Sequence, residues 1–301
     1  MDLSRVKNPQ LCQKKIDLLA KIPTDLTFNY QLTLDYHGVT TTLNSSRESI
    51  LKLVRQLVPP SWIANRPSDM KLELNVCSIK DFNIVNMDWE NEESPECLTG
   101  ELDNYEIAIQ RDFAGKMMGN TIYAIINEDM ADGFFNVLRW FMPRKLLNIK
   151  KTVLHSSCVV INDKASFFLG HSGYGKSTLT TLVDDKLVLG DDMNILYQHQ
   201  DSYQSQGAAL GGLYDNKSIL DLSFPVGAFY WLCKSSENKV EKMGAAQAYR
   251  KFISSCANVF WNETDPQVAS AMMSLSLDVV KRYPFYNLYF SLNKGFWKYV
   301  K

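Results

Sequence analysis

The sequence predicts a two-part fold, with a small α+β domain over residues 1–118 and an α/β domain over residues 119–301. In the first part, apolar and polar residues alternate over residues 26–43, which is typical of paired strands. In the second part, an apolar strand-like run over residues 164–169 leads into a glycine-rich loop and then into a helical segment. With 46% hydrophobic residues, the chain can bury a core in each part.

The first part begins with a β-hairpin and a short helix. The alternation over residues 26–43 is interrupted at His37 and Gly38, which predict the hairpin turn. Ser45, with Glu48 three residues later, has the spacing of a capping box at the start of an amphipathic helix. The following Pro59 and Pro60 are expected to end this helix.

Two further segments complete the first part. Residues 70–79, MKLELNVCSI, have the composition of a strand. Residues 88–104, DWENEESPECLTGELDN, are acidic and poor in apolar residues, and they predict an exposed loop or a linker.

From residue 105 onward, across the predicted boundary at 118/119, strands and helices alternate. Residues 105–113 and 121–127 are expected to be strands, and residues 131–142 a largely buried helix ended by Pro143. Two more strands follow, joined by a turn at residues 162–163. Packed helices are predicted near the carboxyl terminus, over segments GAAQAYRKFISSCANVF and PQVASAMMSLSLDVVKRY.

Charge and cysteine content exclude several classes of protein. The formal net charge is -1, and the Lys and Arg residues form no block, so nucleic acid is not expected as a partner. The six cysteines form no CxxC pair, which predicts reduced thiols and neither a zinc site nor a disulfide framework.

The polar amino-terminal segment and the absence of a long apolar run predict a cytoplasmic protein without membrane association.

The glycine-rich loop is the strongest functional signal. Its residues fit the pattern G-x-x-x-x-G-K-[ST], placed between a strand and a helix as a phosphate-binding loop requires. Glycines let the backbone curl so that successive N–H groups point at phosphate oxygens, and the following helix adds the positive end of its dipole. The predicted nucleotide-binding residues are Gly170, His171, Ser172, Gly173, Tyr174, Gly175, Lys176, Ser177 and Thr178.

A pair of adjacent carboxylates follows the loop. Asp191 and Asp192 lie between two apolar runs, where the chain has had room to return to the loop. Carboxylates beside bound phosphates can hold Mg²⁺ or accept a proton from an attacking hydroxyl. Asp184 and Asp185 lie at the far end of the helix that leaves the loop, so we interpret them as a solvated turn.

The segment LHSSCVVINDKASFFLGHSGYGKSTLTTLVDDKLVLGDDMNIL resembles HPr kinase/phosphorylase and its relatives, whose nucleotide fold is similar to that of phosphoenolpyruvate carboxykinase. In that family a His precedes a hairpin, the hairpin leads into the phosphate-binding loop, and a strand with an Asp-Asp pair follows. His155, the loop and Asp191-Asp192 match these elements over about residues 150–200. The resemblance implies an α/β nucleotide-binding domain of this type, closer to the shorter kinase-like relatives than to HPr kinase itself.

The resemblance also implies roles for individual residues. Lys176 and the loop amides would hold the phosphates of ATP, and Ser177 with Asp192 would hold Mg²⁺. Asp191 would be the base toward the acceptor hydroxyl, and His155 would lie beside the transferred phosphoryl group. The sequence leaves open which of the two carboxylates is base and which is metal ligand.

Two departures from the family pattern bear on the substrate and on catalysis. Thr178 stands where HPr kinases commonly have an acidic residue, which argues against HPr itself as the acceptor. Residues 199–220 contain no Arg to clamp the γ-phosphate, although Lys217 offers a point charge there.

Two functions are therefore carried forward. The first is a phosphotransferase that moves the γ-phosphate of ATP to a hydroxyl, as of Ser or Thr in a protein or peptide. The second is a nucleotide-binding switch or pseudokinase that docks a partner without phosphoryl transfer. The Asp191-Asp192 pair favours the kinase, whereas the missing Arg favours the switch. Whether the chain forms a homo-oligomer is left open.

Overall fold

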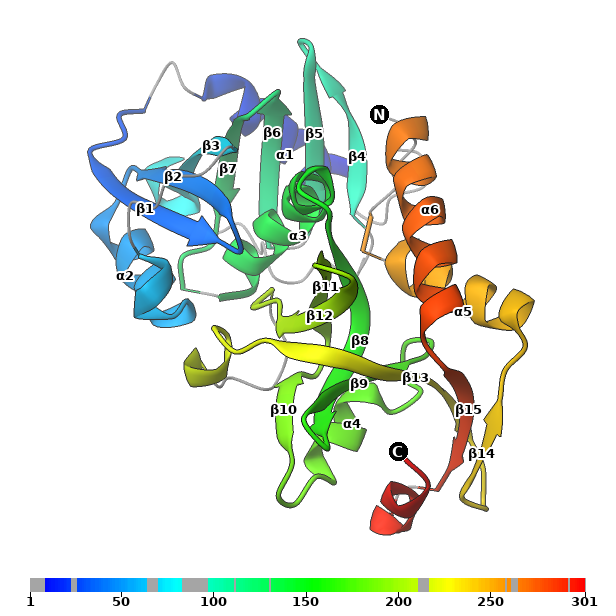
Figure 1. Ribbon diagram of the computed structural model, residues 1–301. Helices are drawn as coiled ribbons and strands as arrows, with labels where there is room; N and C mark the ends of the chain where they lie inside the picture. The colour runs from blue at the N-terminus through cyan, green and yellow to red at the C-terminus, as the bar shows by residue number, and fades with distance from the viewer. Residues whose placement is uncertain are drawn as a thin grey trace. The chain divides into compact units, whose positions relative to one another are not determined.

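The chain divides into two compact units, Met1–Met142 and Pro143–Lys301 (Figure 1). This computed structural model describes residues 9–22, 26–63, 70–82, 97–110, 112–129, 131–210, 217–257, 259–260, 265–291 and 293–300. The boundary that the sequence predicted, at 118/119, falls in the turn between two strands that pair with each other, β6 and β7. Strand pairing places both strands in the first unit, which is therefore larger than expected.

The first unit is built around a seven-stranded mixed sheet of order β1-β2-β3-β7-β6-β5-β4. β2, β3 and β7 run parallel to one another, and the other neighbours are antiparallel. Its strands are β1 (Tyr30–Tyr36), β2 (Val39–Ser45), β3 (Lys71–Ser78), β4 (Leu98–Leu102), β5 (Tyr105–Gln110), β6 (Phe113–Met118) and β7 (Thr121–Ile126). Helix α1 (Pro9–Lys21) buries Leu18 and Leu19 against apolar residues of β5, β6 and β7.

The predicted hairpin is confirmed, whereas the predicted loop over residues 88–104 is partly wrong. His37 and Gly38 turn between β1 and β2 with positive φ angles of 52° and 93°. Residues 98–102 form β4, which pairs with β5 across a tight turn at Asp103 and Asn104. Residues 88–96 lie outside the described part of the chain.

Helix α2 (Glu48–Leu57) occurs where the sequence predicts it, but its cap differs. The capping residue is Arg47, and no side chain caps the helix. The hydroxyl of Ser45 instead donates to the carbonyl of Arg47 and accepts from its N–H group. Ser45 thus closes a local turn before the helix, which is an alternative that Ser side chains offer the backbone.

Helix α3 (Ala131–Asn148) continues past Pro143, contrary to the expectation that Pro143 would end it. Proline inside a helix removes one hydrogen bond and costs about 3 kcal/mol. Phe141 and Met142 before the proline and Leu146 after it are fully buried, so packing on both sides of Pro143 offsets that cost.

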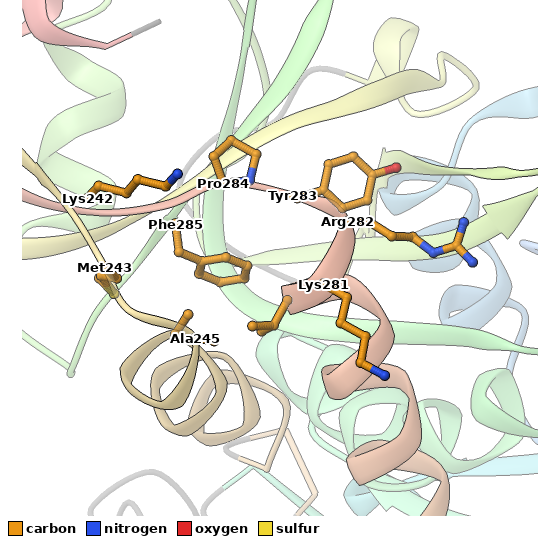
Figure 2. Close-up of a pocket in the computed structure, with 10 residues that line it drawn as sticks. Lys242, Met243, Ala245, Lys281, Arg282, Tyr283, Pro284 and Phe285 are labelled. Atoms are coloured by element: carbon orange, nitrogen blue, oxygen red, sulfur yellow. The ribbon is translucent and has the colours of Figure 1, made fainter.

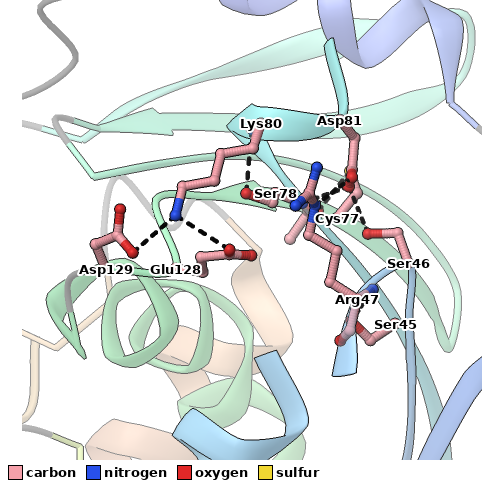
Figure 3. Close-up of polar contacts among 10 residues, drawn as sticks. Ser45, Ser46, Arg47, Cys77, Ser78, Lys80, Asp81, Glu128 and Asp129 are labelled. Atoms are coloured by element: carbon pink, nitrogen blue, oxygen red, sulfur yellow. Dashed lines mark hydrogen bonds and ion pairs between the residues drawn. The ribbon is translucent and has the colours of Figure 1, made fainter. Parts of the chain in front are cut away.

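A polar cluster lies where the parallel strands of the first unit end (Figure 3). Asp81 accepts hydrogen bonds from the Ser46 hydroxyl, the Ser78 N–H group and the Arg47 Nε, the last at 2.6 Å. Lys80 pairs with Glu128 at 3.2 Å and Asp129 at 2.8 Å. In this cluster, therefore, both cationic side chains are paired with carboxylates.

The second unit is built around an eight-stranded sheet in which β9, β13 and β15 run parallel. The path of the sheet is β10-β8-β11-β12-β13-β15-β14, and β9 pairs with both β8 and β13. Its strands are β8 (Lys151–Ile161), β9 (Lys164–Leu169), β10 (Leu187–Gly190), β11 (Met193–His199), β12 (Ser202–Gly207), β13 (Phe224–Lys234), β14 (Lys239–Lys242) and β15 (Phe285–Phe290).

Both faces of this sheet are covered, because alternate residues of β9 and β13 enter two different cores. Phe167 and Phe229 pack with helices α5 (Ala245–Ala257) and α6 (Pro266–Arg282). Phe168 and Tyr230 pack on the other face with helix α4 (Lys176–Thr181) and the short helix η4 (Lys294–Tyr299). In the part of the chain that is described, no helix is both long and apolar enough to cross a membrane.

Candidate functional site

The glycine-rich loop, predicted to bind phosphate, leaves the sheet at the edge where its parallel strands end. Leu169, the last residue of β9, pairs with Trp231 of β13, and β13 pairs in turn with β15. In open α/β sheets, ligands bind at the carboxyl ends of parallel strands. The prediction that the loop follows an apolar strand and precedes a helix is confirmed, although α4 ends at Thr181 and is shorter than expected.

Strand register brings the predicted catalytic residues to the same edge. Ser156 of β8 pairs with Leu169, so His155 lies beside the start of the loop at Gly170. His155 in turn pairs with Met193 of β11, directly after the two carboxylates. The Ser156 N–H group donates to the Asp192 carbonyl at 2.8 Å. Three segments that are separate in the sequence therefore meet in one row.

The loop has the backbone conformation that its glycines permit. Gly173 and Gly175 have φ angles of 74° and 95°, in the left-handed region that most side chains resist. The Tyr174 N–H group donates to the His171 carbonyl at 3.2 Å, which closes the turn. The first helical hydrogen bond of α4 is donated by Leu179 to Gly175, so the preceding amides have no acceptor within the helix.

Lys176 is buried under the loop, with 6% of its surface exposed. Its Nζ donates to the carbonyl oxygens of Gly170 and His171 at 3.0 and 3.2 Å. Burial lowers the pKa of the Lys176 ammonium, and the negative charge of Asp192 partly opposes this shift. Because an ammonium has three N–H donors, these two carbonyls leave one donor for an anion.

The two carboxylates differ in their surroundings. The Asp192 Oδ1 lies 3.2 Å from the His155 Nε2, and both side chains are partly exposed. Asp191 is buried, with 3% of its surface exposed. The structure therefore brings Asp192, His155 and Lys176 into one electrostatic group and places Asp191 directly beside it.

The remaining predicted residues lie on the outer side of the loop. Ser172 and Thr178 are exposed, and Ser177 is half-buried with its carbonyl accepting from the Thr180 hydroxyl at 2.7 Å. The rings of His171 and Tyr174 contact each other edge to face, with centroids 5.4 Å apart. Asp184 and Asp185, interpreted as a solvated turn, are exposed and paired with Lys294 and Lys186.

Asn194 fixes the turn that carries the carboxylates, and sequence reasoning missed it. Its side-chain amide is fully buried and donates to the Ser156 carbonyl at 2.7 Å and to the Gly190 carbonyl at 3.4 Å. A Cβ on Gly190 would lie 2.8 Å from the Asn194 Oδ1. The sequence pattern G-D-D-x-N could have indicated this role of Asn194, because a glycine at a turn lets a buried side-chain amide pack closely against the backbone.

Two lysines and a tryptophan extend the site beyond the loop, and the sequence pattern gave no sign of them. The Lys251 Nζ lies 4.1 Å from the centroid of the Trp231 ring, whose other neighbour is the His171 ring at 5.1 Å. The Lys234 Nζ lies 5.5 Å from the centroid of the Tyr174 ring. Lys217, the other cation considered, begins the short helix η3 (Lys217–Ile219), but its side chain lies outside what is described.

The residues present fit a magnesium nucleotide better than a metal ion held by protein alone. No group of three or more His, Cys, Asp or Glu in the described ranges could hold a metal. Mg²⁺ at phosphate sites is commonly held by one or two carboxylates together with the phosphates. Asp192 and half-buried Ser177 offer oxygen ligands of that kind, and the turned loop glycines suit the phosphates.

Comparisons with known proteins add little to this geometry. No family model and no curated protein matches the chain. Among solved structures, the Hpr(Ser) kinase/phosphatase from Coxiella burnetii is similar over 31% of this chain and 77% of that chain. The identity is 15% and the TM-score is 0.24, which suggests only a distant relationship and carries no argument about activity.

Proposed function

We propose that the chain is a phosphotransferase that moves the γ-phosphate of ATP to a hydroxyl, as of Ser or Thr in a protein or peptide. The observation that carries the proposal is the register that aligns His155, Gly170 and Met193 at the carboxyl edge of β9. This alignment brings the glycine-rich loop and the two carboxylates of the second unit together.

Phosphoryl transfer needs positioning and charge neutralisation more than covalent chemistry. Lys176 would bind the phosphates through its ammonium, and the loop amides would orient them. Ser177 and Asp192 would hold Mg²⁺, which neutralises phosphate charge when bound. Because Lys176 is desolvated, its charge acts more strongly than it would in water.

Asp191 is the proposed base that accepts the proton of the acceptor hydroxyl. It lies in the turn that Asn194 fixes, and it is more buried than Asp192. His155, paired with Asp192, would hold that carboxylate toward the metal and stand beside the transferred group. ATP and Mg²⁺ as cofactors and a cytoplasmic location are part of the same proposal.

The direct test is transfer of label from [γ-³²P]ATP into a size-fractionated extract of the source cell. The full chain should label one peptide or protein band, and the Lys176→Ala chain should label none. If both chains label the same bands equally, the loop does not supply the activity and the proposal fails.

The second candidate is a nucleotide-binding switch that docks a partner without phosphoryl transfer. The cations described around the loop, Lys176, Lys234 and Lys251, are all lysines, which cannot form the bidentate fork of an arginine. Binding of ATP without label transfer to any acceptor in the extract, and with a partner retained only in the presence of ATP, would favour the switch.

A further inference from the structure

A pocket of about 360 Å³ lies in the second unit, away from the phosphate-binding loop (Figure 2). It is formed by the start of α5, the end of α6 and the adjoining ends of β14 and β15. Because β15 and β9 run parallel to β13, the start of β15 and the loop at the end of β9 lie toward opposite edges of the sheet. The volume is within the range of ligand pockets, about 300–1,000 Å³.

The floor of the pocket is apolar and rigidly held. Met243, Ala248 and Phe285 line it, and each is at least nine-tenths buried. Phe285 stacks on Phe229, with ring centroids 4.6 Å apart and planes 9° from parallel. The backbone N–H group of Met243 donates to the Phe285 carbonyl at 2.8 Å. A small apolar side chain of a ligand would therefore meet the few exposed atoms of a well-packed floor.

The rim of the pocket is cationic. Lys242 lies on one side of Phe285, and Lys281 and Arg282 lie on the other, as Figure 2 shows. Arg282 is already engaged, because its Nε pairs with Asp278 at 2.8 Å and its Nη1 donates to the Asp201 carbonyl. Among the described residues, no carboxylate lines the pocket. Within the described part of the chain, Lys242 and Lys281 form no ion pair, although Lys281 lies close enough to Asp278 to help lower the pKa of that carboxyl.

We infer that this pocket docks the acceptor peptide through an acidic–apolar–acidic segment. The central apolar side chain packs on Phe285 and Met243, and the flanking carboxylates pair with Lys242 on one side and Lys281 on the other. Charge complementarity favours this occupant, since two unpaired cations flank an apolar floor. The inference rests on the proposed function, in which a peptide or protein is the acceptor.

The strand register sets the distance between this segment and the acceptor hydroxyl. Phe285 is level with Phe229 and thus with Phe167, three residues before Gly170. That offset is about 10 Å along the strands, and two strand spacings add about 10 Å sideways. The direct separation is therefore about 14 Å, so at least about four extended residues separate the acidic segment from the acceptor Ser or Thr.

The binding test uses a fluorescein-labelled peptide, Gly-Gly-Glu-Leu-Glu-Gly-Gly, and the full chain, with fluorescence anisotropy as the measurement. The peptide should bind at least tenfold more tightly than its counterpart with Gln in place of Glu. Lys242→Ala combined with Lys281→Ala should remove that preference. Lys239→Ala is the matched control, because that lysine lies on the same strand and already pairs with Glu241 at 2.7 Å.

A second variant keeps the test independent of the two lysines. Ala245→Glu places a negative charge at the pocket on the first residue of α5, where an acidic side chain stabilises the helix. This variant should fold normally and bind the Glu peptide at least tenfold more weakly. Equal affinity for the two peptides, no binding of either, or full binding by the double lysine variant would each overturn the inference.

The failure of this inference and that of the proposed function can be told apart. Anisotropy is measured without ATP, so peptide binding without label transfer would retain the docking site and reject the kinase. Label transfer with an unchanged KM for the acceptor in the double lysine variant would retain the kinase and reject the docking site.

Discussion

In each unit, a set of parallel strands ends at a polar edge of the sheet, but the charged side chains at the two edges have different partners. In the first unit, Arg47 and Lys80 are paired with carboxylates. In the second, Lys176 is buried, and among the described residues it donates only to backbone carbonyls. A carboxylate partner neutralises a lysine, whereas carbonyl partners leave its charge available to an anion. If the second edge binds nucleotide as proposed, the comparison teaches that two similar strand edges differ in function through the pairing of their charged side chains.

Among the substitutions considered, replacement of Asp191 is expected to have the largest effect on the rate of the reaction. Asp191→Asn should leave ATP affinity nearly unchanged and lower turnover by about 10²-fold or more, as for loss of a general base. Steady-state phosphoryl transfer measures this effect. Asp184→Asn, an exposed carboxylate outside the site, is the control, and equal turnover in Asp191→Asn and the parent would contradict the assigned role.

A substitution in the polar cluster of the first unit should lower the stability of the protein and leave nucleotide binding unchanged. Asp81→Ala removes three hydrogen-bonded contacts, with Ser46, Arg47 and the Ser78 N–H group. The free energy of unfolding should fall by about 2 kcal/mol, measured by denaturant titration. Mg-ATP affinity should not change. A matching loss of affinity would mean that the first edge also takes part in nucleotide binding.

The turn that carries the carboxylates should be sensitive to one added methyl group. Gly190→Ala places a Cβ against the Asn194 side chain and should shift Asp191 and Asp192, lowering turnover by about tenfold. Gly244→Ala is the matched control, since a Cβ there meets no atom within 4 Å. If the two variants turn over equally, the position of the turn does not limit the reaction.

The smallest expected effect is a pH dependence of binding. Burial lowers the pKa of the Lys176 ammonium from 10.5. Bound phosphate has the opposite effect, because it stabilises the charged form of Lys176. Mg-ADP affinity should therefore be highest below that lowered pKa and fall as the pH rises through it. Above about pH 8 the phosphates no longer titrate, since their second pKa is about 6. Calorimetry should show proton uptake on binding there, and Lys176→Arg, which stays charged, should show none.

The sequence predicted the features that depend on residues close to one another in the chain. The hairpin turn at His37, the glycines of the loop and the carboxylate pair each depend on residues that are neighbours in the chain. The register that aligns His155 with Met193 is a long-range property, and only the family resemblance pointed to it.

The features that sequence reasoning missed depend on tertiary packing. Pro143 remains within α3 because buried residues on both sides hold it there. The segment that forms β4 contains Gly100 and few apolar residues, so its composition does not indicate a strand. It is a strand because it pairs with β5. Trp231 and Lys251 are far apart in the sequence and meet only because α5 packs on the same face of the sheet as Trp231.

The most direct measurement is isothermal titration of Mg-ATP into the parent chain, Lys176→Ala and Lys80→Ala. Removing a buried cation from a phosphate costs about 3 kcal/mol, so Lys176→Ala should bind at least about 10²-fold more weakly. Lys80→Ala, which removes a cation paired with Glu128 and Asp129, should bind like the parent. Unchanged affinity in Lys176→Ala, or an equal loss in both variants, would contradict the assignment of the nucleotide site to the loop of the second unit.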